Sequence, residues 1–438
     1  MSKQFQKPRG TEDVLPAMQP YWIAIHKAIQ EITQLFGYSR IDTPIFEDAA
    51  LFEKGTGDTT DIIEKEMYSF ADRGGDFLAL TPEATPALCR AYLENGMGSQ
   101  PQPVRLYTTA PMFRYDRPQQ GRLRQFTQFD CEVLGSGDPY TDAELIELLW
   151  GFYEHLGLTG IEIRLSSIDD LATRKNYIDD LLAYYQPLSD SLSEDSQRRL
   201  QTNPLRLLDS KDERDLAFKE KAPKLIDRLS EDAAKHFETV KESLTTAAIP
   251  FTIDPLLVRG LDYYNRTVFE FVPQGDNRAQ NTIGAGGRYD GLMKNLGGPS
   301  TPAVGFAAGF ERIILEMQRQ EKILVPANNV TIYIAHLGTE AGKESIRLAS
   351  ALRKNKLSTV IGESTRSLKA QLRKANTSGV QITIIIGEEE MSRGTAIIKS
   401  MRTDQAQVEA PLNTIPSEII KLLNHKNDML TQEFSTNE

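Results

Sequence analysis

The sequence predicts an α+β protein with more than one domain. At 438 residues, the chain is longer than a single hydrophobic core usually organises. Two strand-like stretches around a polar loop, within residues 104–134, predict a long antiparallel hairpin. Charge-rich helical segments fill about 169–250, and from residue 330 strands alternate with helices. These observations predict a mixed core, a helical insertion within it and a compact C-terminal α/β domain.

A helix and a strand are expected at the start of the chain. Apolar side chains recur at helical spacing over about residues 17–36 and stop at Gly37, a residue type that commonly ends a helix. A strand-like stretch then runs from Tyr38 to Phe46, with a proline inside it.

The segment Thr81-Pro82-Glu83 has the order of a capped helix start. Threonine is a common N-cap, proline suits the first helical position, and an acid is favourable in the first turn. On this segment alone, capping explains Glu83 better than ligand binding does.

The hairpin concentrates positive charge in an acidic chain. The formal net charge is −11 at pH 7, yet residues 104–128 contain one acid, Asp116, against five arginines: Arg105, Arg114, Arg117, Arg122 and Arg124. Scattered surface arginines usually form a solvated face. Strand alternation argues against that here, because it places a largely polar run on one face: Arg122, Arg124, Phe126, Gln128, Asp130 and Glu132. This face suits a ligand with phosphates at one end and a cation at the other.

The segment at 257–271 offers further candidates. Arg259 precedes a glycine, and the pair Tyr263 and Tyr264 leads into an alternating strand. An equally good explanation is that the tyrosines fill the core and that Arg259 pairs with Asp262.

Glycine is concentrated between residues 284 and 309, which hold eight of the chain's 30 glycines. Such density is used where the backbone turns sharply or lies against a ligand. It predicts the floor of a pocket, and Arg312, just inside the next helix, could reach a phosphate or stack on a base.

The remaining patterns exclude several classes of protein. The polar N-terminus and the lack of any run of 18 apolar residues predict a cytosolic chain without signal peptide or membrane span. The cysteines, Cys89 and Cys131, and five scattered histidines exclude a disulfide scaffold and a structural zinc site. The glycine-containing segment 338–344 lacks the spacing of a phosphate-binding loop.

Several segments resemble one family. Tyr38–Pro44, residues 106–126 (LYTTAPMFRYDRPQQGRLRQF) and residues 304–313 (VGFAAGFERI) resemble motifs 1, 2 and 3 of the class II aminoacyl-tRNA synthetases. Four others resemble signatures of the histidyl-tRNA synthetase family, over about residues 5–425: RGTEDVLP (9–16), TPEATPALCRAY (81–92), LVRGLDYYNRTVFEF (257–271) and GAGGRYDGL (284–292).

The resemblance implies a fold and a division of the chain. Residues 1–325 would form the class II catalytic core, an antiparallel sheet flanked by helices, with the insertion at about 169–250 near the tRNA acceptor arm. Residues 330–425 would form an α/β anticodon-binding domain, and 426–438 a tail without an evident role. Motif 1 lies at a two-fold interface in this family, so a homodimer is expected.

The resemblance also implies a reaction. L-Histidine and ATP, with Mg²⁺, would give histidyl-adenylate and pyrophosphate, and the histidyl group would then pass to the 3′ end of histidine tRNA. The main alternative is a catalytically inactive, synthetase-like regulatory subunit of histidine biosynthesis, but such chains usually lack the C-terminal domain and degrade LVRGLDYY. Another class II synthetase, for threonine, proline or glycine, is disfavoured by Glu132 and the double tyrosine.

Histidine binding is carried over to nine positions: Glu83, Ala84, Thr85, Arg114, Gln128, Glu132, Arg259, Tyr263 and Tyr264. Glu83, with Thr85 beside it, and Gln128 would hold the α-amino group. Glu132 and Tyr264, with Tyr263 near, would hold the imidazole, and a site that pairs both ring nitrogens rejects apolar isosteres.

The catalytic residues by resemblance are Arg259 and Arg114, and ATP binding is carried over to Arg114, Asp116, Arg122 and Arg312. Arg114 would contact the α-phosphate and the substrate carboxylate, and Arg122 and Arg312 the outer phosphates. Asp116 stands where the family more often has Glu. Neither a protein metal-ligand cluster nor zinc is implied.

Two regions are candidates for contact with tRNA. Arg117 and Gln119 in the motif 2 loop have donors suited to the extra 5′ guanosine of histidine tRNA, and either could read it. A basic helix face in the C-terminal domain is as well explained by solvation as by RNA contact: Arg366, Lys369, Arg373 and Lys374.

Overall fold

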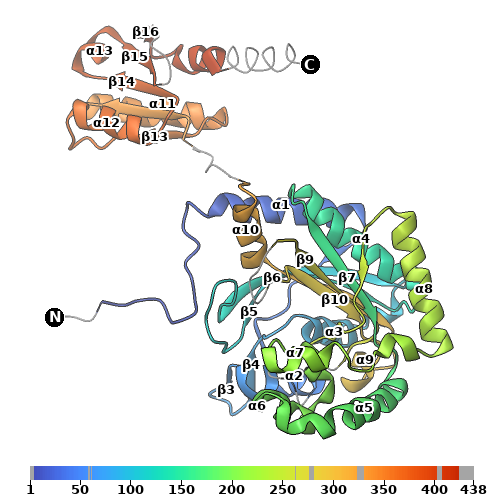
Figure 1. The fold of residues 1–438 in the computed structure, drawn as a ribbon. Coiled ribbons are helices and arrows are strands. Elements are labelled where there is room, and N and C mark those ends of the chain that lie inside the picture. Colours follow the sequence, from blue (N-terminus) through green and yellow to red (C-terminus); the bar gives the residue numbers. More distant parts are fainter. Residues whose placement is uncertain are drawn as a thin grey trace. The chain divides into compact units, whose positions relative to one another are not determined.

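The chain divides into two units, Met1–Val325 and Pro326–Glu438, which are described separately (Figure 1). The computed structural model describes residues 4–57, 60, 62–261, 263–275, 281–322, 330–401 and 407–423. Asp262 and the tail 426–438 lie outside the described residues.

An eight-stranded sheet forms the centre of the first unit. Its strand order is β1 (Ser39–Arg40), β5 (Val104–Phe113), β6 (Gln125–Leu134), β11 (Ala303–Gly309), β10 (Gly284–Arg288), β9 (Asn265–Pro273), β7 (Ile161–Ser167) and β8 (Thr252–Ile253). Only the two edge pairs, β1 with β5 and β7 with β8, are parallel. The predicted antiparallel sheet is therefore confirmed, with the β5–β6 hairpin close to one edge.

Four helices cover one face of this sheet: α1 (Gln19–Leu35), α4 (Pro139–His155), α8 (Glu231–Thr246) and α10 (Phe310–Arg319). Their apolar stripes meet alternate side chains of β6, including Phe129, Cys131 and Val133, in the largest hydrophobic core. Both cysteines are buried and free, as expected from their isolation in the sequence. The opposite face of β6 is left for a ligand.

The predicted strand from Tyr38 to Phe46 is wrong in its extent. Only Ser39 and Arg40 form β1, and the chain then leaves the large sheet. It enters a separate three-stranded sheet with the order β2 (Phe46–Asp48), β4 (Phe77–Leu80) and β3 (Ser69–Ala71). One strand cannot belong to both sheets, so the chain between residues 40 and 46 is irregular. Helix α2 (Ala49–Thr56) and a π-helical turn (Ile62–Glu66) lie between β2 and β3.

The predicted cap at Thr81 is also wrong. The helix, α3 (Thr85–Glu94), begins four residues later, with Ala84 as its N-cap residue and Pro86 in its first turn. The backbone of Thr81 instead bonds to two neighbouring segments, since its N–H donates to Ile45 O and its carbonyl accepts from Phe113 N. Tertiary bonding keeps Thr81 extended, so Glu83 lies on a loop ahead of the helix.

The region predicted as an insertion is mainly helical and has no strand among its described residues. It contains α5 (Leu171–Tyr185), α6 (Glu194–Thr202), α7 (Glu213–Lys219) and short 3-10 turns, followed by α8. The first three helices share a second core with the segment 257–264. The insertion also bonds to that segment, because Arg206 Nη1 donates to Gly260 O at 3.0 Å and Arg174 donates to Tyr264 O.

The second unit is an α/β domain. Its sheet has the order β13 (Thr359–Ile361), β12 (Ile332–His336), β14 (Ile382–Ile386), β15 (Thr395–Ser400) and β16 (Val408–Pro411), parallel across the first three strands and antiparallel beyond. Helices α11 (Thr339–Lys354), α12 (Leu368–Thr377) and α13 (Glu388–Arg393) connect the strands, and residues 415–423 are helical. Short α13 and β16 are additional to the predicted elements, because neither has a strong apolar period.

The basic face predicted on α12 is partly paired within the domain. Arg366 precedes the helix and donates to Glu363 at 2.7 Å, and Lys374 donates to the other oxygen of the same carboxylate at 3.3 Å.

In the part of the chain that the structure describes, no helix is long and apolar enough to cross a membrane.

Candidate active site

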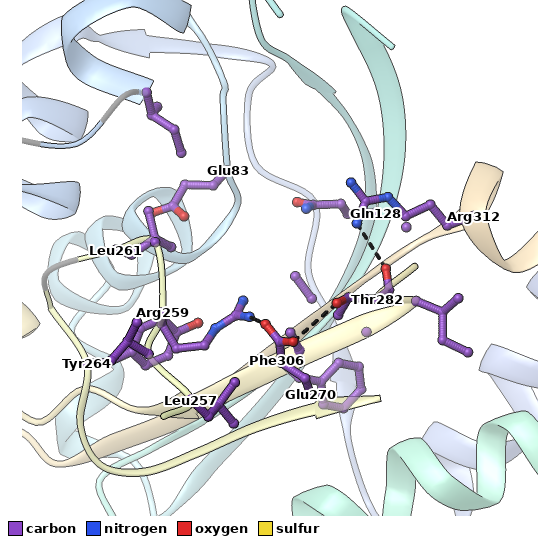
Figure 2. A pocket seen from close by; sticks show the side chains of 18 of the residues that line it. Glu83, Gln128, Leu257, Arg259, Leu261, Tyr264, Glu270, Thr282, Phe306 and Arg312 are labelled. Carbon is purple, nitrogen blue, oxygen red and sulfur yellow. Dashed lines mark hydrogen bonds and ion pairs between the residues drawn. The ribbon is translucent and has the colours of Figure 1, made fainter. Parts of the chain in front are cut away.

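A cavity of about 650 Å³ opens over the free face of β6, between the sheet, the 257–264 segment and the insertion. Figure 2 shows Glu83 and Arg259 on one side of it and Gln128 and Arg312 on the other. The cavity therefore combines carboxylates with arginines from segments far apart in the sequence.

The alternation predicted for β6 places its side chains as expected. Phe126, Gln128 and Asp130 line the cavity, whereas Phe129 and Cys131 belong to the core on the other side. Glu132 has the predicted orientation but lies deeper, 1% exposed. Arg124 does not line the cavity, and its guanidinium stacks 3.8 Å from the ring centre of Tyr115.

Small residues on the neighbouring strands make room for this face. On β11, Gly309, Ala307 and Gly305 are the register partners of Gln128, Asp130 and Glu132. A Cβ atom at Gly305 would lie 1.5 Å from Glu132 Oε2 and 2.8 Å from the Cys131 carbonyl oxygen. The glycine concentration seen in the sequence thus includes one residue that Glu132 requires.

Replacement of Gly305 by alanine is expected to displace Glu132, raise the KM for histidine and destabilise the fold by about 1–3 kcal/mol, because overpacking against backbone cannot relax. Chemical unfolding and steady-state kinetics measure the two effects. The matched control is Gly309→Ala on the same strand, whose added Cβ meets no atom within 4 Å. If Gly305→Ala and Gly309→Ala were equally stable, the conclusion that Glu132 requires a glycine at position 305 would be wrong.

Glu83 is a buried carboxylate at the wall of the cavity, 5% exposed. Tyr263 donates its hydroxyl hydrogen to Glu83 Oε2 at 3.4 Å, and Glu83 Oε1 has no hydrogen-bond partner among the described residues. Burial raises the pKa of Glu83 to about 7, and the neighbouring cation of Arg114 opposes that rise. Arg114 is held beside it through a 2.8 Å bond from Nε to Pro82 O. The site thus holds an acid that a bound cation would ionise.

Binding of histidine, the amino acid that the resemblance implies, is expected to weaken as the pH falls below about 7, because the Glu83 carboxyl becomes neutral and no longer attracts an ammonium group. Below that pKa, each pH unit should lower the affinity about tenfold. Calorimetric titration across the neutral range measures this dependence.

Free histidine also titrates near this range, so Glu83→Gln is the control for the pH titration. The variant should bind weakly and show a shallower pH dependence than the wild type, because the titration of Glu83 has been removed. Identical pH dependence in the two proteins would show that Glu83 is not the group responsible.

Glu132 is hydrogen-bonded through both oxygens. Thr85 Oγ1 donates to Oε1 at 2.7 Å, and the Tyr289 hydroxyl donates to Oε2. Burial raises the pKa of Glu132 to about 8, although both hydrogen bonds oppose the rise. Tyr289 is absent from the residues predicted from sequence; its place in the GAGGRYDGL signature was the available signal. Its ring lies 5.5 Å from that of Tyr263, which is 4.7 Å from that of Tyr264.

Arg259 is part-buried at the cavity wall, with 18% of its side chain exposed. It forms an ion pair with Glu270 on β9, and its guanidinium lies 5.7 Å from the ring centre of Tyr264. Thr282 donates to the second Glu270 oxygen at 3.2 Å, which completes the chain of contacts seen in Figure 2. The pairing of Arg259 with Asp262 that the sequence left open falls outside the described residues. Glu270 is absent from the residues predicted from sequence, although it is eleven residues from Arg259 and lies within the same 257–271 signature.

The predicted ATP-binding residues lie along the same cavity. Arg122 forms an ion pair with Asp116 and a second contact with Glu66 at 3.3 Å. Arg312 donates to Gly121 O at 3.0 Å and to Thr282 O at 2.9 Å. The Arg114 guanidinium lies 5.3 Å from the Phe126 ring centre. These cations surround one end of the cavity, which suits a polyanionic ligand.

The two residues predicted to meet tRNA lie elsewhere. Arg117 and Gln119 are exposed on the loop between β5 and β6 and do not line this cavity.

Within the described ranges there is no group of three or more His, Cys, Asp and Glu side chains that could hold a metal ion.

An antiparallel sheet that carries arginines and buried carboxylates on its free face, with a motif 2 hairpin and a motif 3 strand and helix, defines a class II aminoacyl-tRNA synthetase. Within that class, the chain belongs to the histidyl-tRNA synthetase family. The family model described as "Histidyl-tRNA synthetase" matches residues 10–313, and the model described as "Anticodon binding domain" matches residues 331–422.

Related proteins agree over nearly the whole chain. A protein of Dehalococcoides mccartyi named "Histidine--tRNA ligase" is 48% identical over 417 residues, which cover 95% of this chain and 99% of that protein. One of the same name from Natranaerobius thermophilus is 42% identical over 94% of this chain and 98% of its own length. The crystal structure of apo histidyl-tRNA synthetase of S. aureus superimposes with a TM-score of 0.79 at 33% identity, covering 95% of this chain and 99% of that one.

Proposed function

We propose that this chain is a histidine–tRNA ligase that activates L-histidine with ATP and then esterifies the 3′ end of histidine tRNA. One observation carries the proposal: a single cavity contains buried acids for an amino acid, Glu83 among them, together with arginines for triphosphate, including Arg259. Relatives named as such ligases match 94–95% of the chain, including its C-terminal domain, which favours this function over the regulatory subunit.

The histidine end of the cavity lies around Glu83 and Thr85. The carboxylate of Glu83 would pair with the α-ammonium group, and the N-cap residue Ala84 would position that loop. Tyr263 and Tyr264 would flank the imidazole. Glu132 is held in place by hydrogen bonds from Thr85 and Tyr289, and it would accept a hydrogen bond from an imidazole N–H. Gln128 reaches in from the opposite side (Figure 2), so it would complete the site once ligand is present.

The ATP end lies around Arg122 and Arg312. Arg114 would bridge the substrate carboxylate and the α-phosphate, and the other two arginines would bind the outer phosphates. By resemblance, Asp116 would contact the adenine of ATP. It is already paired with Arg122, so it would have to bind both groups or release Arg122.

The chemical step needs no general base on the protein. The histidine carboxylate is ionised at neutral pH and attacks the α-phosphorus, with pyrophosphate as the leaving group. Charge accumulates on the α-phosphate oxygens in the transition state, where Arg259 and Arg114 would stabilise it.

Mg²⁺ would enter with ATP. It prefers oxygen ligands and is commonly held by phosphates with one or two carboxylates. Glu311, next to Arg312 on α10, lines the cavity and would supply such an oxygen; burial raises its pKa to about 7. The ion would supply charge neutralisation at the phosphates.

tRNA would approach from the insertion. Three of its cationic side chains line the cavity: Arg206, Lys211 and Lys219. They suit phosphates of the acceptor end. We assign recognition of the 5′ guanosine to Arg117 or Gln119 on the exposed loop, and recognition of the anticodon to the domain at 330–425. The catalytic core would be residues 1–325, and the protein would act in the cytosol.

A homodimer is part of the proposal. The small sheet that follows motif 1 exposes Phe46, Phe70 and Phe77, and Ile45 beside it is also exposed. Phe46 and Phe70 share one face of this sheet, because their register partners, Leu80 and Leu78, are two residues apart on β4. Exposed aromatic side chains on one face of a sheet suit burial against a second copy. Sedimentation of the wild type and of Phe46→Asp tests this; a monomeric wild type would contradict it.

The ligase proposal is tested by ATP–pyrophosphate exchange across the amino acids, with tRNA charging as the second measurement. Exchange should require histidine, and histidine tRNA should be the charged product. A folded protein that supports no histidine-dependent exchange would instead favour the regulatory subunit.

A further inference from the structure

Asp130 is a buried acid in the cavity to which the predicted site assigns no role. It is 1% exposed, lines the cavity, and its Oδ2 has no hydrogen-bond partner among the described residues. On β6 it lies midway between Gln128 and Glu132 on the same face, opposite Thr108 of β5 and Ala307 of β11. An unpaired carboxyl in such a position destabilises the empty protein, unless a ligand pairs with it.

The surroundings of Asp130 identify the end of the cavity to which it belongs. The charged groups that act on it most strongly are Glu132, Glu83 and Arg114, and only the last is a cation. Arg114 is also a neighbour of Glu83. The geometry agrees: Asp130 is next to Glu132 on this face of β6, and Glu132 accepts a 2.7 Å hydrogen bond from Thr85, two residues after Glu83. Asp130 therefore faces the end where the proposed function places the α-carbon of the amino acid.

Four buried polar side-chain atoms of the cavity lining have no partner among the described residues, and all but Arg259 Nε are acceptors. Among the described residues that line the cavity, three buried side-chain acceptor atoms lack a partner: Glu83 Oε1, Gln128 Oε1 and Asp130 Oδ2. An ammonium group brings three N–H donors and a positive charge. Glu132 offers less, because each of its oxygens already accepts a hydrogen bond. Gln128 approaches from the side opposite Glu83 (Figure 2), so a second acid near Glu83 is the better-placed partner.

We infer that Asp130 is a further histidine-binding residue, whose Oδ2 accepts a hydrogen bond from the α-ammonium group beside Glu83. This inference rests on the proposed function. It makes the pocket selective for a free amine, since a ligand without the ammonium group would leave two buried acids unpaired.

The test compares two ligands with two variants. L-Histidine and its deaminated analogue imidazole-4-propionate share the ring and the carboxylate but differ in the ammonium group. Calorimetric binding to Asp130→Asn should be about tenfold weaker than to the wild type for histidine, the difference between a charged and a neutral hydrogen bond. Binding of the analogue should be unchanged or tighter. Thr108→Val is the matched control, because it removes a buried unpaired hydroxyl opposite Asp130 and lies outside the cavity lining.

Thermal unfolding supplies a second measurement that a purely structural role would not reproduce. Ligand-free Asp130→Asn should melt a few degrees above the wild type, because a buried unpaired acid has been removed. A residue kept for folding would show the opposite shift. If Asp130→Asn does not fold, Asp130→Ala provides the same ligand comparison with a larger expected loss for histidine.

Either of two results would overturn the inference. One is that Asp130→Asn binds histidine and the deaminated analogue with equally weakened affinity, and the other is that Asp130→Asn and Asp130→Ala bind histidine as tightly as the wild type. These outcomes are distinct from failure of the proposed function. If the wild type supports no histidine-dependent exchange and binds no histidine, the ligase proposal fails and the role of Asp130 fails with it. If the wild type does both, only the variants decide the role of Asp130.

Discussion

Replacement of Arg259 by alanine is expected to slow histidyl-adenylate formation by about 100- to 1,000-fold, the loss typical of one preorganised charge donor. The side chain lies at the cavity wall, where Glu270 and the Tyr264 ring fix its guanidinium. Charge that develops on the α-phosphate would meet this cation without reorganisation. Histidine-dependent pyrophosphate exchange measures the rate, and the KM for histidine should change much less.

The control for this prediction separates lost catalysis from a damaged site. Arg259→Ala leaves the part-buried Glu270 beside Thr282 without its cation, so a double variant, Arg259→Ala with Glu270→Gln, removes that unpaired charge. The double variant should unfold like the wild type and remain as slow as the single one. If Arg259→Ala exchanged pyrophosphate at the wild-type rate, the catalytic role of Arg259 would be refuted. If the double variant regained the wild-type rate, the slow exchange of the single variant would be due to the unpaired charge of Glu270.

Replacement of Arg288 by leucine is expected to lower the free energy of unfolding by about 3–5 kcal/mol, the usual cost of breaking a buried ion pair from one side. Arg288 and Asp142 are both fully buried, and they pair across β10 and α4. Arg288 also donates to Asp290 at 3.0 Å and to the Ser136 carbonyl at 2.7 Å. Without Arg288, the Asp142 carboxylate keeps one side-chain partner among the described residues, His236 at 2.8 Å. Urea unfolding measures the loss.

The pH dependence of this pair has a defined sign. Burial by itself would raise the pKa of Asp142, but Arg288 and His236 hold it below the usual value. Because the folded pKa is lowered, the stabilisation is present at neutral pH and is lost as the pH falls through the acid range. A double variant, Arg288→Leu with Asp142→Leu, should recover most of the stability. A single variant within about 1 kcal/mol of the wild type would contradict the prediction.

Several features of the site could be predicted from local sequence because their causes are local. Strand alternation in the hairpin correctly put Gln128 and Glu132 on one face, since the side-chain period of a strand is independent of the rest of the fold. Glycine density similarly indicated the close approach at Gly305, where β11 crosses Glu132.

Other features could not be predicted because their causes are contacts between distant segments. Thr81-Pro82-Glu83 has every local mark of a helix start, yet backbone bonds from Thr81 to Ile45 and Phe113 override it and leave Glu83 facing the cavity. The hydrogen bond from Thr85 to Glu132 likewise joins residues 47 apart in the sequence.

By itself, the sequence determined the class of fold, the family and the types of side chain available to bind an amino acid and a triphosphate, because motifs and periodicity are encoded along the chain. The tertiary structure alone decided which acids are unpaired and in the cavity, and which are already hydrogen-bonded. Asp130 and Glu132 are two residues apart on one strand, and only the neighbouring Thr85 and Tyr289 distinguish them. Burial and pairing are properties of the surroundings in space, and these fix the pKa of a carboxyl and its freedom to bind.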